Sequence, residues 1–165
     1  KIFRAERINT HGGSIRIYVK KDKKTKIENS VKILLKEETE FGIKKYKTYQ
    51  LFAKKVYKIK ENVKNNISKL KNQHKVIIGY GSPAKATTAL NFFGISKEID
   101  SIVEDNKFKQ GKFIPGVKIP IVSKESFNKK ADCALVLAWN FFDEISKKNI
   151  NFADKFVNIK ELEKD

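Results

Sequence analysis

Cysteine is almost absent from this chain: Cys133 is the only one among 165 residues. A single cysteine excludes a disulfide framework and a cluster of thiolate metal ligands. Its place within the apolar run 131–138 predicts a small buried core residue. No apolar run approaches the roughly 20 residues of a membrane-spanning helix, and no signal peptide is recognisable. We therefore expect a cytoplasmic protein with no membrane partner and no metal site.

Arginine is also scarce, although the chain is strongly basic. The 36 Lys and Arg residues include only Arg4, Arg7 and Arg16, and with 19 Asp and Glu the formal net charge is +17. Such a charge suggests a nucleic-acid-binding module. However, most lysines are spread along helical stretches rather than clustered with aromatic residues. This pattern favours a solvated basic surface over a nucleic-acid interface.

The most informative stretch is residues 75–92, KVIIGYGSPAKATTALNF. Residues 76–78 form a short apolar run typical of a parallel strand buried on both faces. Residues 84–92 predict a helix. Gly79 and Gly81 turn the chain between the two and permit positive φ angles and close approach to the backbone. The stretch therefore predicts a strand, a glycine turn and a helix.

The candidate phosphate-binding residues of this turn are Gly79, Gly81, Ser82, Ala84 and Lys85. The free N–H groups and dipole of a helix N-terminus attract anions, and lysine adds a positive charge. The turn is incomplete as a dinucleotide fingerprint, because alanine replaces the third glycine of G-x-G-x-x-G. It is also not a P-loop, because G-x-x-x-x-G-K-[ST] does not occur. Two interpretations remain open: a phosphate or nucleotide site, and a tight structural turn.

Further polar residues follow the next buried runs. Strand 99–103 ends at Glu104 and Asp105, about 20 residues beyond the turn, where a ribose hydroxyl is usually bound. A solvated strand end is the alternative. The run 133–138 ends at Asn140, after Trp139, at the carboxyl end of a strand, where α/β sheets bind ligands.

The chain predicts an α/β fold in two parts. Residues 1–74 form a partial β-ribbon, within 1–20, followed by linker helices at 27–41 and 45–72. Residues 75–165 form a Rossmann-like domain with a parallel sheet. Its remaining elements are predicted to be a Gly- and Pro-rich loop of functional character at 107–123, a helix starting at Ser123, a helix at 141–148 and a strand at 155–159.

Several motifs in this order resemble one enzyme family. They are T-H-G-G-S-I-R at 10–16, G-Y-G-S-P-A-K at 79–85, D-x-x-x-K-Q-G-K at 105–112, Pro115-Gly116 with Ile119-Pro120, and Ala138-Trp139-Asn140. Together they resemble the C-terminal part of the sugar C-methyltransferases, which use S-adenosylmethionine to methylate nucleotide-linked deoxysugars. The resemblance runs from about residue 4 to 159.

The resemblance implies a parent enzyme with a zinc module, an S-adenosylmethionine domain and a C-terminal Rossmann-like domain. This sequence contains no Cys-rich zinc ligands, no methyl-donor loop and no Tyr-x-Glu-His active-site stretch. We therefore expect it to bind a nucleotide-linked deoxysugar but not to catalyse methyl transfer alone. Residues 1–20 would belong to a larger sheet, and their apolar faces predict pairing with another chain or with a second copy of this one.

Within such a site, position and charge predict roles for individual residues. Gly81, Ser82, Ala84 and Lys85 would contact the pyrophosphate. Lys109 and Gln110 would reach phosphate or sugar, Asp105 a ribose or sugar hydroxyl, and Asn140 the mouth of the site. His11, which by its residues alone is either catalytic or part of a tight turn, would contribute to the sugar site with Ser14 and Arg16. The alternatives are a nicotinamide dinucleotide-binding domain of an oxidoreductase and, less favoured, a nucleic-acid-binding module.

Overall fold

Residues Ile77–Tyr80 form β3, the central strand of a five-stranded parallel sheet. All four residues are buried, because β3 pairs with β4 (Ser101–Val103) on one side and with β6 (Ala131–Val136) on the other. An apolar strand without polar alternation is typical of a parallel strand covered on both faces. The predicted buried parallel strand is confirmed.

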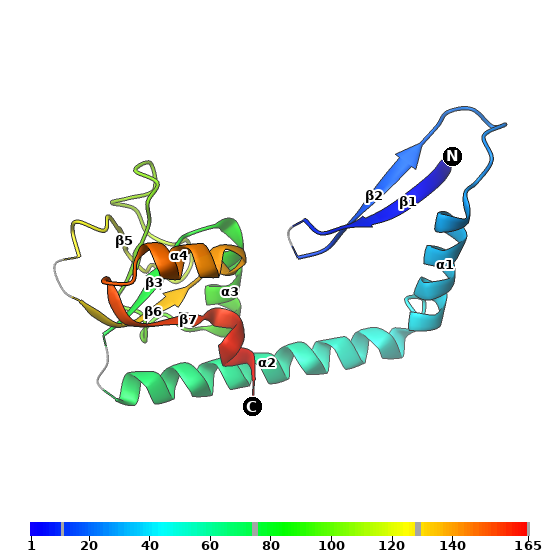
Figure 1. Ribbon diagram of the computed structural model, residues 1–165. Coiled ribbons are helices and arrows are strands. Elements are labelled where there is room, and N and C mark those ends of the chain that lie inside the picture. Colours follow the sequence, from blue (N-terminus) through cyan, green and yellow to red (C-terminus); the bar gives the residue numbers. More distant parts are fainter. Residues whose placement is uncertain (11, 74–75, 128–129, 165) are drawn as a thin grey trace. The chain divides into compact units, whose positions relative to one another are not determined.

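The strand order of this sheet is β5-β4-β3-β6-β7, where β5 is Ile121–Val122 and β7 is Ala153–Asn158. All pairs are parallel. From β3 the chain moves outward through β4 to β5, then returns to the other side of β3 as β6 (Figure 1). The carboxyl ends of β3 and β6 therefore flank the point where the strand order reverses. Open α/β sheets bind ligands at this point.

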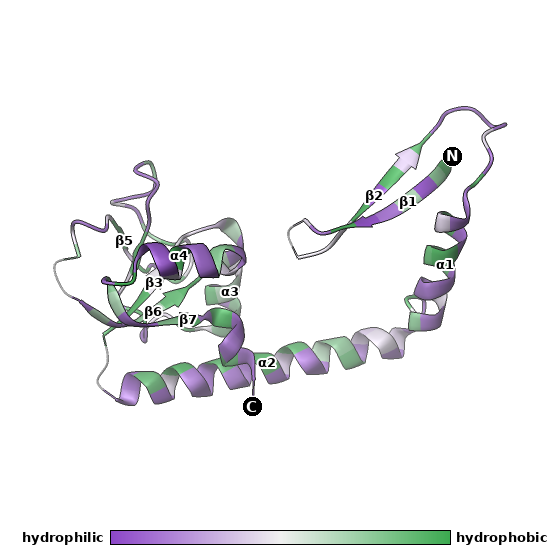
Figure 2. Cartoon of the chain, viewed as in Figure 1, coloured by the Kyte–Doolittle hydropathy of each residue, from purple (hydrophilic) through white to green (hydrophobic). Residues whose placement is uncertain are grey.

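The computed structural model describes residues 1–10, 12–73, 76–127 and 130–164. Helices cover both faces of its parallel sheet. One face packs against α3 (Ala84–Phe93), the second half of α2 (Tyr46–Asn72) and the short 3₁₀ helix η2 (Ile159–Glu163). The other face packs against α4 (Phe142–Lys148). Figure 2 shows apolar residues in the central strands, both apolar and hydrophilic residues along α2, and mostly hydrophilic residues on α4.

The chain divides into two compact units, Lys1–Lys55 and Val56–Asp165, with the division inside α2. The sequence predicts the change of domain at residues 74–75. The difference arises because Val63 and Ile67 are fully buried in the core of the second unit. The apolar periodicity of α2 predicts a buried stripe but does not say which surface covers it.

The first unit contains an antiparallel pair, β1 (Ile2–Ile8) and β2 (Ser14–Val19), and helix α1 (Asn29–Phe41). Ser30 on α1 accepts a hydrogen bond from the Ala5 backbone at 3.3 Å, and Ala5 is buried. Helix α1 ends at Gly42 in the left-handed conformation, with φ 82°. The predicted ribbon and this helix are confirmed. Among the described residues, no helix is long and apolar enough to cross a membrane.

Two local predictions were wrong. Ser123 does not start a helix: its Oγ accepts the Ser126 N–H at 3.1 Å, and residues 124–126 form a turn. The Ser123 hydroxyl thus accepts the same kind of hydrogen bond as an N-cap residue, and such a bond also stabilises a local turn. Strand β5 was not predicted, since it lies inside the Gly- and Pro-rich stretch, and two residues carry too little pattern to identify.

Candidate functional site

Gly79, within β3, and Gly81, directly after it, are both closely surrounded by residues of the neighbouring chain segments. A Cβ on Gly79 would lie 2.9 Å from side-chain atoms of Ile102 and Leu137. Gly81 has φ +83°, and its Cβ would lie 2.9 Å from that of Ala138. Glycine is therefore required at both positions for the packing of β3 against β4 and β6. The structural-turn interpretation accounts for both glycines without a ligand.

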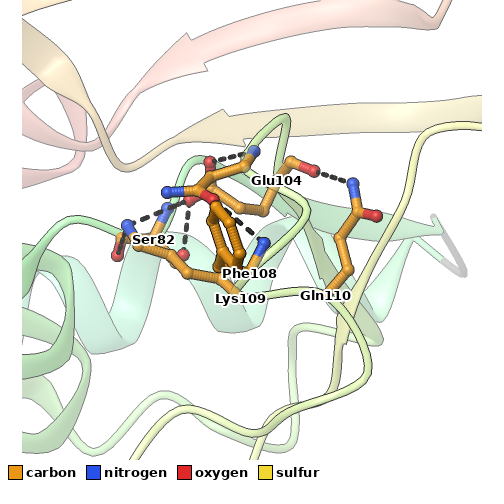
Figure 3. Close-up of polar contacts among 6 residues, drawn as sticks. Ser82, Glu104, Phe108, Lys109 and Gln110 are labelled. Carbon is orange, nitrogen blue, oxygen red and sulfur yellow. Dashed lines mark hydrogen bonds and ion pairs between the residues drawn. The ribbon is translucent and has the colours of Figure 1, made fainter.

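Beyond the glycines, the Ser82 N–H group holds a carboxylate of the protein itself. Glu104 Oε2 accepts hydrogen bonds from Ser82 N at 2.9 Å and Ser82 Oγ at 2.5 Å (Figure 3). Glu104 Oε1 accepts the Asn106 N–H at 3.0 Å. Lys109 Nζ donates to the Ser82 carbonyl at 3.0 Å and lies 3.4 Å from Glu104 Oε2. We call Ser82, Glu104 and Lys109 the turn cluster.

These contacts hold the Glu104 carboxylate in its charged form. Burial raises the pKa of Glu104, but hydrogen bonds from Ser82 and Asn106, together with the positive charge of Lys109, outweigh burial and leave this pKa below its ordinary value. Only 12% of the Glu104 side chain is exposed. A phosphate at Ser82 would therefore have to displace a stable internal anion.

Gln110 anchors the functional loop rather than facing an open site. Its Nε2 donates to the Glu104 carbonyl at 2.8 Å (Figure 3). Further along the loop, Asn91 of α3 donates to the Pro115 carbonyl at 2.9 Å, and a Cβ on Gly116 would lie 2.0 Å from the Asn91 Oδ1. The loop is thus fastened to β4 and to α3, which explains the ordered Pro-Gly pair without a ligand.

Asp105 lies in a second polar group, which we call the tyrosine cluster. The Tyr80 hydroxyl lies 3.1 Å from Asp105 Oδ1 and 3.2 Å from Asn149 Oδ1, and Lys124 Nζ donates to the same Asn149 oxygen at 2.7 Å. Burial, then the Asp105 charge, raises the pKa of Tyr80 to about 12. Tyr80 therefore stays protonated at neutral pH and supplies one hydrogen bond to this pair of acceptors.

Strand alternation separates Glu104 from Asp105. Ile102 pairs with Gly79, and Val103 pairs with Tyr80. Glu104 continues the Ile102 side, and Asp105 continues the Val103 side, so they reach the turn cluster and the tyrosine cluster respectively. Asp105 was predicted as the site residue, and Glu104 was not predicted as the partner of the turn. The period of two after Ile102 is the signal that identifies it.

Lys85 belongs to a third group, which three neighbouring strands bring together. Lys85 lies in the first turn of α3, after β3, and its Nζ is 4.2 Å from the centre of the Trp139 ring. Trp139 follows β6, and Lys160, which follows β7, places its Nζ 6.0 Å from the same ring. Trp139 and Lys160 were not predicted as site residues, because no local sequence signal indicates that they lie together. Asn140 is exposed beside Trp139.

The candidates from the first unit make contacts within that unit. Ser14 Oγ donates to the Thr10 carbonyl at 3.1 Å, and Arg16 donates to Glu6 at 3.2 Å. Glu6 also accepts bonds from Arg4 and Tyr18. His11 lies outside the described residues. Within the described part of the chain, no group of three or more His, Cys, Asp or Glu side chains is arranged to hold a metal ion.

The parallel order of five strands, with a glycine turn where that order reverses, defines a Rossmann-like α/β domain. A family model described as the C-methyltransferase C-terminal domain matches residues 9–159. C-methyltransferase NovU of Streptomyces niveus is 30% identical over 149 residues, which cover 88% of this chain and 36% of that protein. The chain belongs to the C-methyltransferase C-terminal domain family, and it matches about a third of the length of that relative.

Proposed function

We propose that this chain is the nucleotide-sugar-binding, C-terminal part of an S-adenosylmethionine-dependent sugar C-methyltransferase. Family membership and the name of the relative support methyl transfer to carbon. The observation that carries the binding role is the third group, where Lys85 and Lys160 converge on Trp139 beside the reversal point of the sheet. Positive charge at that edge suits the phosphates of a nucleotide-linked sugar.

Under this proposal, the chain positions the nucleotide sugar and supplies no group that takes part in bond making. S-adenosylmethionine supplies an electrophilic methyl group, and a base removes a proton next to the sugar's keto group before the carbon attacks. Anchoring the diphosphate at the sheet edge would hold the keto-sugar in one orientation, and orientation supplies much of the rate in such reactions. The sugar class and the diphosphate link both belong to the proposal.

The glycine turn of this domain offers the methyl donor no free N–H group at Ser82. Side chains of Ile102, Leu137 and Ala138 close the space around Gly79 and Gly81, and Glu104 occupies the Ser82 N–H. We therefore assign donor binding and the catalytic base to residues outside this sequence. The occupied Ser82 N–H also disfavours a nicotinamide dinucleotide, because such a cofactor binds its pyrophosphate to free backbone N–H groups at the turn.

Titration calorimetry with the 165-residue protein tests the binding role. A dTDP-linked deoxysugar and dTDP should bind, and NAD⁺ should neither bind measurably nor compete. Binding of NAD⁺ in preference to dTDP would favour the oxidoreductase alternative and refute the proposal. A steep, general loss of binding with salt, equal for unrelated nucleic acids, would instead favour the basic-module alternative.

A radiolabel assay tests the catalytic role. The 165-residue protein should transfer no methyl group from S-adenosylmethionine to the nucleotide sugar, whereas the whole enzyme should. Turnover by the 165 residues alone would show that the donor site or base lies within them, contrary to the assignment above.

A further inference from the structure

Two lysines share one aromatic ring at the carboxyl edge of the sheet. Lys85, Trp139 and Lys160 follow β3, β6 and β7, which are neighbours in the sheet. Their backbones are held in place independently of any ligand: Lys85 is in the first turn of α3, and the Lys160 N–H donates to the Asn158 side chain at 3.1 Å. The three side chains therefore converge because the fold places them together.

Neither lysine is neutralised by a carboxylate in the described part of the chain. Among the described residues, no ion pair within 4.0 Å involves Lys85 or Lys160. Glu163 lines the small cavity of about 60 Å³ beside Trp139 without pairing with either lysine. Glu104, the acid that contacts the glycine turn, is already held by Ser82 and Lys109. Two ammonium groups that approach one ring repel each other, and an indole ring compensates only part of that repulsion.

We propose that Lys85 and Lys160 form a diphosphate clamp on the two sides of the sheet's reversal point, with Trp139 as its floor. The clamp rests on the proposed function and gives it a specific anchor. It also moves the diphosphate away from the predicted position at Gly81, Ser82 and Ala84, where Glu104 already supplies the anion. The ligand is a small-molecule diphosphate, because its two linked anionic groups match two separate cations.

The only tryptophan of the chain lies inside the clamp, so its fluorescence reports directly on binding. Inorganic pyrophosphate at constant ionic strength should change the Trp139 emission along a saturable curve, and sulfate should do so much more weakly. Lys85→Ala and Lys160→Ala should each raise the pyrophosphate Kd about tenfold or more, which corresponds to about 1.4 kcal/mol. Lys160→Arg should restore most of the affinity, because it keeps the charge.

The matched control is Lys97→Ala, which removes an exposed lysine from the same unit and should change Kd less than twofold. If Lys97→Ala and Lys160→Ala raise the pyrophosphate Kd equally, the binding reflects general surface charge and the clamp is wrong. An equal change of Trp139 emission with sulfate and with pyrophosphate would lead to the same conclusion. Circular dichroism of each variant checks that its fold is intact.

A parallel titration with the dTDP-linked deoxysugar separates the clamp from the proposed function. If the nucleotide sugar binds and Lys160→Ala has no effect, the clamp is wrong and the function stands. If pyrophosphate binds through both lysines but the nucleotide sugar does not bind, the clamp stands and the function is wrong. If neither ligand binds, both are wrong.

Discussion

Replacing Glu104 with glutamine should destabilise the second unit far more than an ordinary surface change. The carboxylate accepts hydrogen bonds from Ser82 N, Ser82 Oγ and Asn106 N, and a longer one of 3.4 Å from Lys109 Nζ. Glutamine keeps the shape, but it loses the charge and turns an NH₂ group toward these donors. A hydrogen bond to a charged group contributes about 1.5–3 kcal/mol, and a neutral one about 1 kcal/mol.

The expected cost of Glu104→Gln is about 2–3 kcal/mol. Two charge-assisted bonds become neutral and one donor loses its acceptor. The Lys109 charge adds little to this cost, because Lys109 is 41% exposed and water screens its charge. For a unit of this size, the cost corresponds to a decrease in melting temperature of about 8–12 °C. Thermal unfolding followed by circular dichroism measures it.

Asp154→Asn is the matched control in the same unit. Asp154 forms an ion pair with Lys130, but both side chains are 58% exposed. Exposed pairs of this kind contribute less than about 1 kcal/mol. If Glu104→Gln proves no more destabilising than Asp154→Asn, the turn cluster does not hold the fold in the way we describe.

The effect of Glu104→Gln should also depend on pH in a defined direction. The pKa of Glu104 in the folded protein is below its ordinary value of 4.5, so the unfolded chain binds a proton first as the pH falls. The stability from Glu104 is therefore fully present above about pH 4.5 and is lost as the pH falls through the folded pKa. The difference between wild type and Glu104→Gln should shrink below pH 4.5, and a difference that grows there would contradict the assignment.

Three further outcomes are expected. Gly81→Ala should lower the free energy of unfolding by about 2 kcal/mol or more in chemical denaturation, because Gly81 has a positive φ and a new Cβ would contact Ala138. Gly94→Ala should lower it by only about 1 kcal/mol, because Gly94 has φ +69° but open space around it. Equal losses would mean that Ala138 moves aside without cost. Tyr80→Phe should leave the tyrosinate absorbance at pH 10 unchanged, because the pKa of Tyr80 is about 12, and a loss of signal would place that pKa near its ordinary value. Ile17→Lys on β2 should reduce self-association in light scattering, since Ile17 is 54% exposed, and a wild-type protein that is monomeric at all concentrations would refute pairing through the ribbon.

The sequence by itself determined the elements of the fold and the edge of the sheet where its polar residues gather. Apolar runs without alternation identify β3 and β6, because a strand buried on both faces needs apolar side chains on both. The step of three and four residues identifies α2, and the G-x-G turn identifies the connection to α3. Such patterns can be recognised from the sequence because each depends on residues that are neighbours along the chain.

Only the tertiary structure decided what each polar residue touches. Glu104 and Ser82 are 22 positions apart, and Lys85 and Trp139 are 54 apart, yet each pair is in contact. Which acid faces the turn follows from the register of β4 against β3, and which lysine joins Lys85 follows from β7 lying beside β6. Register and strand order depend on the packing of the whole core around Gly79 and Gly81. For this reason the sequence predicts which edge of the sheet carries the polar residues, while the tertiary structure determines which of these residues contact one another.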